Sequence, residues 1–342
     1  CTPAKAELVW QDAMNLVTDI KYNADSNGGN ISFKVDRSSI RQGNAVIAIK
    51  DVSDAILWSW HVWVTDEDIN NVIEITNHQN VKYNFMPVNL GQCDGNTITY
   101  EERSCKVKFI AGDQSKEITI KQLANVIATG SNAPFYQWGR KDPLYPSNGM
   151  GNTTKIWYDK EGIPSTANPM KGTFSAGNDC IKNCILNPNL MHNRYNGDYT
   201  YYNLWSADNK TTSANDNPVN KTIYDPCPVG FKLPASNAFT GFTTTGESVS
   251  SSTQVNGTWS SSEKGWYFYT NSEKTQSIFF PALGYRSYST MRPGSIGTQG
   301  CFWSAHPVAK GNNYYLRTSS VDVQPTYMVD RGFGYALRPC QD

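Results

Sequence analysis

Short aromatic runs separated by glycine and proline constrain the C-terminal third of the chain more than any other feature. The runs occupy residues 265–269, 278–286, 301–305, 314–316 and 331–340. Aromatic and β-branched side chains favour strands, whereas glycine and proline favour the turns between them. The sequence therefore predicts a series of β-strands whose aromatic side chains fill a core.

The composition argues against nucleic-acid binding and against a transmembrane helix. The 342 residues carry 30 Lys and Arg and 30 Asp and Glu, so the formal net charge is zero. Phosphate binding needs clustered cationic side chains, and none stands out. The longest strongly apolar stretch, residues 55–64, is interrupted by Ser59 and His61. It falls short of the roughly 20 residues that cross a bilayer.

Alternating patterns predict strands in the first third of the chain as well. In residues 56–64, Trp60 and Val62 fall on one face and Ser59 and His61 on the other. Residues 105–109 and 118–122 alternate on either side of Ala-Gly-Asp-Gln, which predicts a hairpin with a loop of four or five residues. Residues 7–20 fit either an amphipathic helix or a pair of strands.

Helical signals are few, and two segments have the composition of surface loops. Helices are expected at residues 179–186 and 235–242. Residues 205–221 and 243–262 are nearly free of aliphatic side chains, so we expect long loops there. The predicted fold class is α+β and β-rich.

A cysteine at the first position indicates a bacterial lipoprotein. Lipoprotein precursors are cleaved just before a cysteine whose thiol carries a diacylglycerol, although an arbitrary chain boundary would also place a cysteine first. Cys1 would then carry acyl chains and anchor the protein in the outer membrane, exposed at the cell surface. Residues 1–7 are expected to form a short tether. Export would place the other seven cysteines in an oxidising compartment, where at least one must stay unpaired.

The sequence contains no recognisable catalytic or metal-binding motif. It has no CxxC pair, and the four histidines do not stand at ligand spacings beside the cysteines. Cys180 and Cys184 share a helix face, where we expect small buried side chains. The acidic residues 66–68 are expected to form a solvated turn. We therefore expect a protein without enzymatic activity, bound metal or cofactor.

Several motifs together resemble a known family. Residues 225–234 (DPCPVGFKLP), 303–316 and 332–340 in the second half, with residues 58–66, 85–91 and 136–143 in the first, resemble the "major paralogous" and fimbrillin-associated domains of surface lipoproteins from Gram-negative anaerobes. The resemblance spans roughly residues 44–342 and implies a C-type-lectin-like core. It lacks the Glu-Pro-Asn and Trp-Asn-Asp motifs of calcium-dependent sugar-binding lectins.

The resemblance implies one compact domain over residues 8–342, with the hairpin 97–122 as an excursion; a division near residue 128 is the alternative. It also implies a disulfide between Cys227 and Cys340, because this fold brings its C-terminus back beside earlier strands. The implied function is an accessory binding subunit of a nutrient importer of the SusC/SusD type, with a TonB-dependent transporter and a SusD-like lipoprotein as partners. The alternative is a free or pilus-associated adhesin that recognises a glycan, a peptide or a protein.

Lectin-like folds display long loops on one side, so the residues that flank those loops are the expected contacts. Aromatic rings supply stacking faces and arginines supply forked donors, which often carry binding energy. The predicted contact residues are Trp266, Tyr285, Arg286, Tyr288, Arg292, His306, Tyr327 and Arg331.

Overall fold

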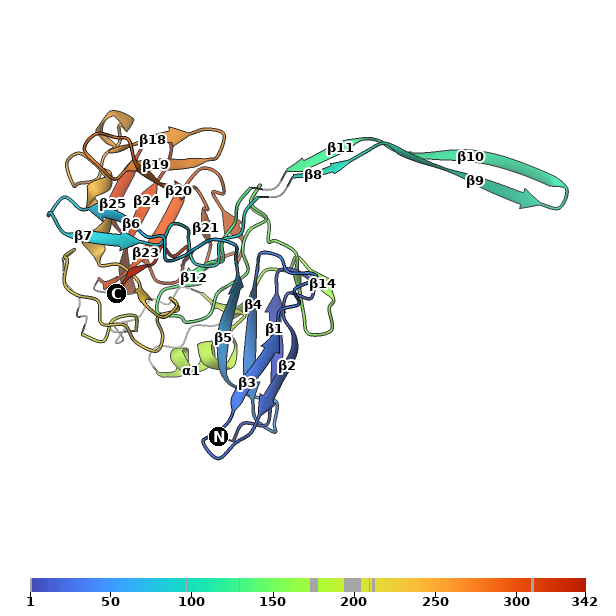
Figure 1. Ribbon diagram of the computed structural model, residues 1–342, viewed down its shortest axis with the longest axis horizontal. Helices are drawn as coiled ribbons and strands as arrows, with labels where there is room; N and C mark the ends of the chain where they lie inside the picture. The colour runs from blue at the N-terminus through green and yellow to red at the C-terminus, as the bar shows by residue number, and fades with distance from the viewer. Residues whose placement is uncertain are drawn as a thin grey trace.

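A computed structural model describes residues 2–95, 97–128, 130–172, 178–193, 204–208, 210, 213–308 and 311–342. The fold is β-rich, as predicted. Its helical segments within these ranges are α1 (Asn178–Leu186) and the 3-10 helices η1 (Ser236–Phe242) and η2 (Ser252–Gln254), so both predicted helical regions are confirmed. Figure 1 shows the N-terminal strands below, the C-terminal strands above and to the left, and a long arm that projects from the body.

The N-terminal strands form an antiparallel sheet in the order β14-β13-β1-β4-β5. Residues 7–20 contain the end of β1, turns at 12–17 and the start of β2 rather than a helix, and the pair β2–β3 lies over one face of this sheet. The strands are β1 (Lys5–Gln11), β2 (Thr18–Asn23), β3 (Asn30–Lys34), β4 (Gly43–Lys50), β5 (Ile56–Val64), β13 (Trp157–Tyr158) and β14 (Pro164–Ser165).

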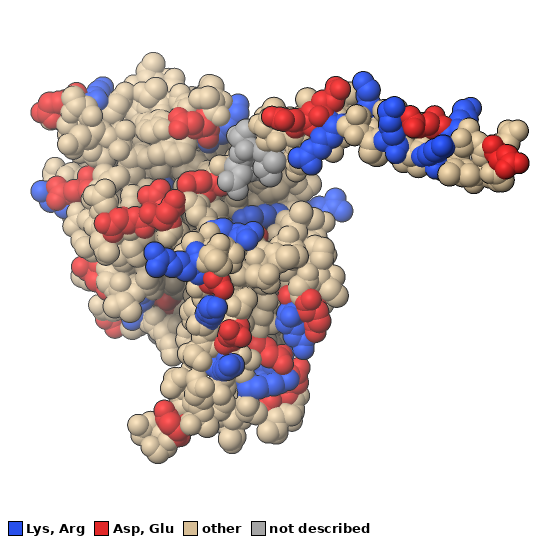
Figure 2. All heavy atoms as spheres, turned by 45° about the vertical axis from the view of Figure 1, so that its right-hand side comes forward, with Lys and Arg blue, Asp and Glu red and all other residues tan. Residues whose placement is uncertain are grey.

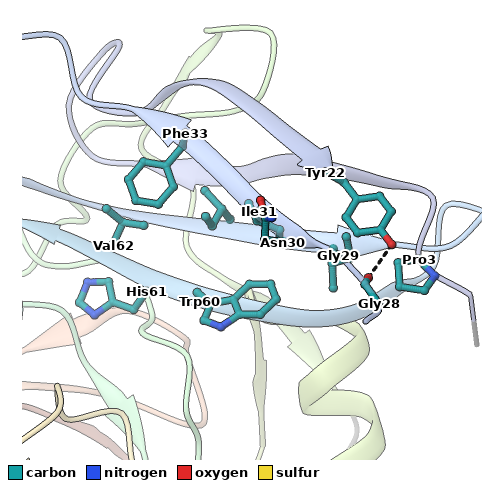
Figure 3. A pocket seen from close by; sticks show the side chains of 12 residues that line it. Pro3, Tyr22, Gly28, Gly29, Asn30, Ile31, Phe33, Trp60, His61 and Val62 are labelled. Atoms are coloured by element: carbon teal, nitrogen blue, oxygen red, sulfur yellow. Dashed lines mark hydrogen bonds between the residues drawn. The ribbon is translucent and has the colours of Figure 1, made fainter. Parts of the chain in front are cut away.

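The predicted alternation along β5 is confirmed for residues 59–63, whereas Trp58, which should share a face with Trp60, instead contacts Lys141 and Tyr224. Ser59 Oγ donates a hydrogen bond to Asp142 at 2.8 Å, and Trp63 Nε1 donates one to the Gln92 carbonyl at 3.0 Å. Both partners lie outside the N-terminal sheet and the arm, in the rest of the described chain, which we call the body. Trp60 and Val62 instead face β2–β3 (Figure 3). One face of the N-terminal sheet therefore packs on the body, and the other faces the β2–β3 hairpin.

The C-terminal third folds into the strands that its aromatic runs predict. The sheets have the orders β23-β24-β25, β18-β19-β20, β17-β27-β7-β6 and β12-β26-β21-β22, with a parallel pair β15-β16. The strands are β6 (Ile73–Thr76), β7 (Lys82–Phe85), β12 (Tyr136–Gln137), β15 (Met170–Gly172), β16 (Leu190–His192), β17 (Phe231–Lys232), β18 (Gly257–Ser260), β19 (Gly265–Tyr269), β20 (Ser277–Pro281), β21 (Tyr285–Arg286), β22 (Pro293–Gly294), β23 (Gly300–Pro307), β24 (Asn312–Thr318), β25 (Val323–Asp330), β26 (Gly334–Tyr335) and β27 (Cys340–Gln341).

Aromatic side chains fill the core between these sheets, as expected. Phe242 and Phe268 stack with ring centroids 3.9 Å apart, and Phe280 meets Phe302 edge-on at 5.0 Å. Residues 243–262, expected as a surface loop, instead include η2 and β18. The loop prediction fails because Val249 and Val255 are buried in this core and tie the segment down.

The strand pairing also bears on the expected tether at residues 1–7 and on the alternative domain boundary near residue 128. Residues 5–7 are not part of a free tether, because they belong to β1 and Lys5 lies opposite Lys50 of β4. The Lys5 ammonium also pairs with Asp54 at 2.6 Å, which holds the segment on the sheet. A boundary near residue 128 would cut two sheets, since β13 pairs with β1 and β27 pairs with β7.

The predicted hairpin forms the arm. It consists of β9 (Arg103–Ala111) and β10 (Gln114–Gln122), continued toward the body by β8 (Thr97–Tyr100) and β11 (Asn125–Ala128). Ala111 lies opposite Gln114, so the loop has two residues rather than four or five. Gly112 takes a φ of 59°, and a glycine at the first loop position suits the tight turns of such hairpins.

Gly91 is a position where the fold requires glycine. Its φ is +76°, and an added Cβ would lie 2.6 Å from both Pro134 Cδ and Asn44 Oδ1. We expect Gly91→Ala to lower the free energy of unfolding by about 2–3 kcal/mol, from backbone strain and overpacking together. Urea denaturation measures the effect. Gly151→Ala is the control, because nothing lies within 4 Å of its added Cβ; an equal loss in both variants would contradict the prediction.

Candidate functional site

An apolar groove of about 620 Å³ opens between the β2–β3 hairpin and strands β4 and β5 (Figure 3). We call it the β3–β5 groove. Phe33 and Trp60 face each other across it, and each keeps 43% of its surface exposed. The apolar side chains that line it are Ile31, Phe33, Ile47, Ile49, Trp60 and Val62.

The groove exists because the β2–β3 hairpin covers the sheet incompletely. Beneath one end of the hairpin, Leu16, Val17, Ala45 and Ile47 form a buried cluster. The register of β2–β3 shifts between Thr18 and Lys21, and such irregularities bend and twist a strand pair. Among the described strands, β5 pairs only with β4 and β3 only with β2. On β5, Lys141 Nζ already donates to the Ser59 carbonyl at 2.9 Å and α1 contacts the strand, so the unpaired edge of β3 is the more accessible one.

The groove offers contact surface rather than acid–base chemistry. His61 reaches it, but its Nε2 donates to Asn44 Oδ1 at 2.9 Å and its Nδ1 accepts from the Tyr136 hydroxyl at 3.0 Å. Burial lowers the pKa of His61 to about 3, so the ring is neutral at physiological pH. Tyr22 is also engaged, because its hydroxyl donates to the Gly28 carbonyl at 2.7 Å (Figure 3).

A second exposed apolar surface runs along the arm. Directly opposed residues of β9 and β10 share a face, and one face carries the pairs Cys105–Ile120 and Val107–Ile118. Phe109 lies beyond them on the same face. Phe109 is 58% exposed and Ile120 53% exposed, so water reaches side chains that would normally be buried. We call this surface the apolar face of the arm.

The opposite face of the arm is mostly polar and carries both signs of charge, although the exposed Ile110 lies on it near the tip. Lys106 lies opposite Thr119 and Lys108 opposite Glu117, and the Lys106 ammonium reaches Glu117 at 2.9 Å. Figure 2 shows cationic and anionic side chains interspersed along the whole arm. The arm is thus an amphipathic two-stranded ribbon, and such a pair is only marginally stable in water by itself.

Four of the predicted contact residues are buried, so their assignment to a recognition surface is wrong. Trp266 lies in the aromatic core, and its Nε1 donates to the Ser319 carbonyl at 2.7 Å. His306 Nδ1 accepts from the Ser236 backbone at 3.3 Å, and burial lowers the pKa of His306 to about 4. Both side chains support the packing of the body rather than a surface contact.

The other two buried residues of the predicted contact set, Arg286 and Arg331, donate hydrogen bonds to neighbouring segments of the chain. Arg286 is fully buried, and its guanidinium donates to the Met291 carbonyl at 2.6 Å. Arg331 lies 4.2 Å above the Trp138 ring, and its Nε donates to Asn313 Oδ1 at 2.9 Å. Backbone carbonyl oxygens and side-chain amide oxygens that water cannot reach need hydrogen-bond donors, and the arginine guanidinium groups supply them.

The remaining predicted residues do not form one surface cluster. Tyr285 and Tyr288 are partly buried against the two sides of Phe333, at centroid distances of 5.5 and 4.7 Å. Arg292 and Tyr327 are exposed, and Tyr327 lies on β25, where its ring contacts Tyr315. Of these four residues, only Arg292 and Tyr327 present exposed side chains to a partner.

The predicted disulfide between Cys227 and Cys340 is absent, because both thiols are free. Cys340 packs in the cluster around Phe280, whereas Cys227 packs in a separate cluster around Trp303. The two side chains serve different parts of the core, although β27 and β17 are paired. Cys1, the predicted lipid attachment site, lies outside the described residues.

Comparisons with family models, with curated proteins and with solved structures found no match. Within the described ranges, the helices are too short and polar to span a membrane.

The sequence patterns predicted β5, which borders the groove, and β9 and β10, which form the arm, but they did not predict the two exposed apolar surfaces. The alternation in residues 105–109 and 118–122 was the signal for the arm. The β3–β5 groove has no comparable signal, because it depends on how far one hairpin covers another sheet. The sequence also places Cys180, Cys184 and His192 in the pattern C-x3-C-x7-H, which the spacing rules for zinc motifs did not single out.

Proposed function

We propose that this protein is a non-catalytic binding subunit that joins a larger protein assembly through the apolar face of its arm. The exposure of Phe109, Ile118 and Ile120 on a projecting ribbon is the observation that carries this proposal. Burying a large apolar side chain contributes about 1.5–3 kcal/mol, so a partner that covers these three would gain substantial affinity. Covering the face would also stabilise a ribbon that is marginal alone.

The chemistry of the arm favours a protein as the occupant. Cationic and anionic side chains alternate along it, with Lys106, Lys108 and Lys121 beside Glu102 and Glu117. An anionic membrane surface or a nucleic acid would require a surplus of positive charge. A protein face with its own apolar strip and mixed rim matches this pattern.

The β3–β5 groove suits an extended segment of the same partner. A strand laid beside β3 would find an edge that pairs with no other described strand, and the groove would supply apolar contacts for alternate side chains. The two surfaces would then engage one partner at two places. Neither His61 nor His306 is poised for catalysis, since both rings are neutral and bound into the body.

For the assembly, we propose an outer-membrane nutrient importer of the SusC/SusD type. The protein would be anchored by acyl chains on Cys1 and would contact a TonB-dependent transporter or a SusD-like lipoprotein. The motifs at residues 225–234 and 303–316 support this proposal through their resemblance to surface lipoproteins, and they support a lectin-like core in the body.

The test is extraction of the native protein from its own membranes in mild detergent, followed by quantitative mass spectrometry of what co-purifies. The double variant Phe109→Ser/Ile118→Ser should lose its partner at least tenfold, because each change removes roughly 1.5 kcal/mol or more of buried apolar contact. The matched control is Lys108→Ser/Thr119→Ser on the polar face of the same strands.

Three measurements decide the outcome. Equal partner recovery from both variants would contradict a role for the apolar face. The melting temperature of the body should stay unchanged in both, because the arm projects from it (Figure 1). Intact-mass analysis of the wild-type protein should find acyl chains on Cys1, and a free Cys1 thiol would contradict the membrane anchor.

A further inference from the structure

Helix α1 and strand β16 bring two cysteines and a histidine together. Cys180 and Cys184 stand one helical turn apart on α1, and His192 ends β16. One ligating atom from each of the three lies within 4.8 Å of the other two. Within the part of the chain that the structure describes, this is the one group of three or more such side chains with metal-ligand spacing.

The local sequence explains why the three side chains converge. Asn187 and Pro188 follow the last residue of α1, and the Leu190 amide donates to the Asn187 carbonyl at 3.1 Å, which reverses the chain into β16. Gly172 of β15 lies opposite His192. An added Cβ on Gly172 would collide with Leu190 Cδ2 and lie 3.2 Å from His192 Nδ1, so glycine leaves room for both side chains there.

Arg140 braces the turn that carries this cluster. Its guanidinium donates to the Pro188 carbonyl at 2.8 Å and also to the Leu190 carbonyl. Arg140 also lines one small cavity together with both cysteines, so a positive charge is present beside the two thiolates that a metal would bind. The histidine is only 2% exposed, so its position is set by the surrounding packing.

From this geometry we propose that Cys180, Cys184 and His192 form a zinc site whose fourth position no described residue fills. Two thiolates and one imidazole are donors that Zn²⁺ prefers, with metal–sulfur distances near 2.3 Å and metal–nitrogen distances near 2.0 Å. Ligand atoms within 4.8 Å of one another reach that geometry through small side-chain rotations. The metal would tie α1 to β16.

A small cavity beside the two cysteines offers space for a fourth ligand on the thiolate side of the proposed site. It has a volume of about 50 Å³ and is lined by Cys180, Cys184, Arg140, Leu204 and Tyr224 among others. A space of this size accepts a water molecule, which needs roughly 10–15 Å³ of accessible volume. Three protein ligands and one exchangeable water are the arrangement of zinc sites that bind or polarise a further ligand.

The experiment is a Co²⁺ and Zn²⁺ titration of the full chain, purified under reducing conditions. Co²⁺ should bind at one equivalent with a thiolate-to-cobalt charge-transfer band and the intense visible bands of a tetrahedral site, and Zn²⁺ should displace it. Cys184→Ser should weaken binding by at least roughly 100-fold, because loss of an outer-shell partner alone already costs 10–100-fold. Cys105→Ser, at the exposed cysteine of the arm, should bind as the wild type does.

A second variant keeps the test decisive if Cys184→Ser unfolds. His192→Cys keeps three ligands and should bind Co²⁺ with a stronger charge-transfer band, because a third thiolate is present. Absence of a thiolate band in the wild type would overturn the proposal, as would unchanged binding in both ligand variants. Formation of a disulfide between Cys180 and Cys184 during the titration, in place of metal binding, would overturn it as well.

Discussion

Replacing Arg338 with methionine will lower the free energy of unfolding by about 3–5 kcal/mol, because several buried acceptors lose a charged donor. Arg338 is 1% exposed, and its Nε donates to Asn89 Oδ1 at 2.8 Å. Its Nη atoms donate to the carbonyls of Pro87 at 2.6 Å and Phe279 at 2.7 Å. The guanidinium also lies 4.3 Å above the Phe280 ring.

These contacts connect three separate stretches of chain, so the loss cannot be absorbed by one loop. Methionine keeps most of the volume of the side chain but none of its donors, which separates hydrogen bonding from packing. Arg292→Met is the control, since Arg292 is exposed, and it should change the unfolding free energy by less than about 0.5 kcal/mol. Chemical denaturation measures both. A loss below 1 kcal/mol in Arg338→Met would contradict the prediction.

Acidification from pH 7 to pH 5 will destabilise the protein through two buried histidines. Burial lowers the pKa of His61 to about 3 and that of His306 to about 4, against about 6.5 in the unfolded chain. The stability that the neutral rings contribute is complete above pH 6.5. It falls as the pH drops toward 4 and 3, because only the unfolded chain takes up protons in that window. Each histidine should cost about 2 kcal/mol between pH 7 and pH 5.

The measurement is the unfolding free energy at several pH values for His61→Asn, His306→Asn and the wild type. Each variant should start from a lower stability at pH 7 but lose less between pH 7 and pH 5. His78→Asn serves as the control, because His78 is exposed, and its slope should match the wild type. Parallel pH profiles for all four proteins would show that the buried rings are not responsible.

Local features of this chain were predictable because each depends on a short segment. The aromatic runs, the alternation along β5 and the arm follow from the side-chain period of a strand. The expected helical segments 179–186 and 235–242 correspond to α1 and η1. Residues 243–262 misled the prediction because two valines, Val249 and Val255, suffice to anchor them.

The exposed surfaces and the metal-ligating cluster depend on contacts between distant segments, which composition cannot show. Arg286 looks like a surface donor in the sequence, yet the Met291 and Tyr145 carbonyls that it satisfies draw it into the core. His192 meets Cys184 only because a turn at Pro188 reverses the chain. Predicting such sites requires the partners of each polar group, not only its type.

The way the arm joins the body makes it a separable unit. Thr97 and Ala128 are opposite each other in the β8–β11 ladder, so the two ends of the excursion lie about 5 Å apart. A few residues could bridge that distance, and the chain of the body would remain continuous without the arm. With about 15 residues on each strand side, the arm extends contact roughly 50 Å outward. Binding specificity could therefore be exchanged between proteins as a single cassette, while the body that carries it keeps its own stability.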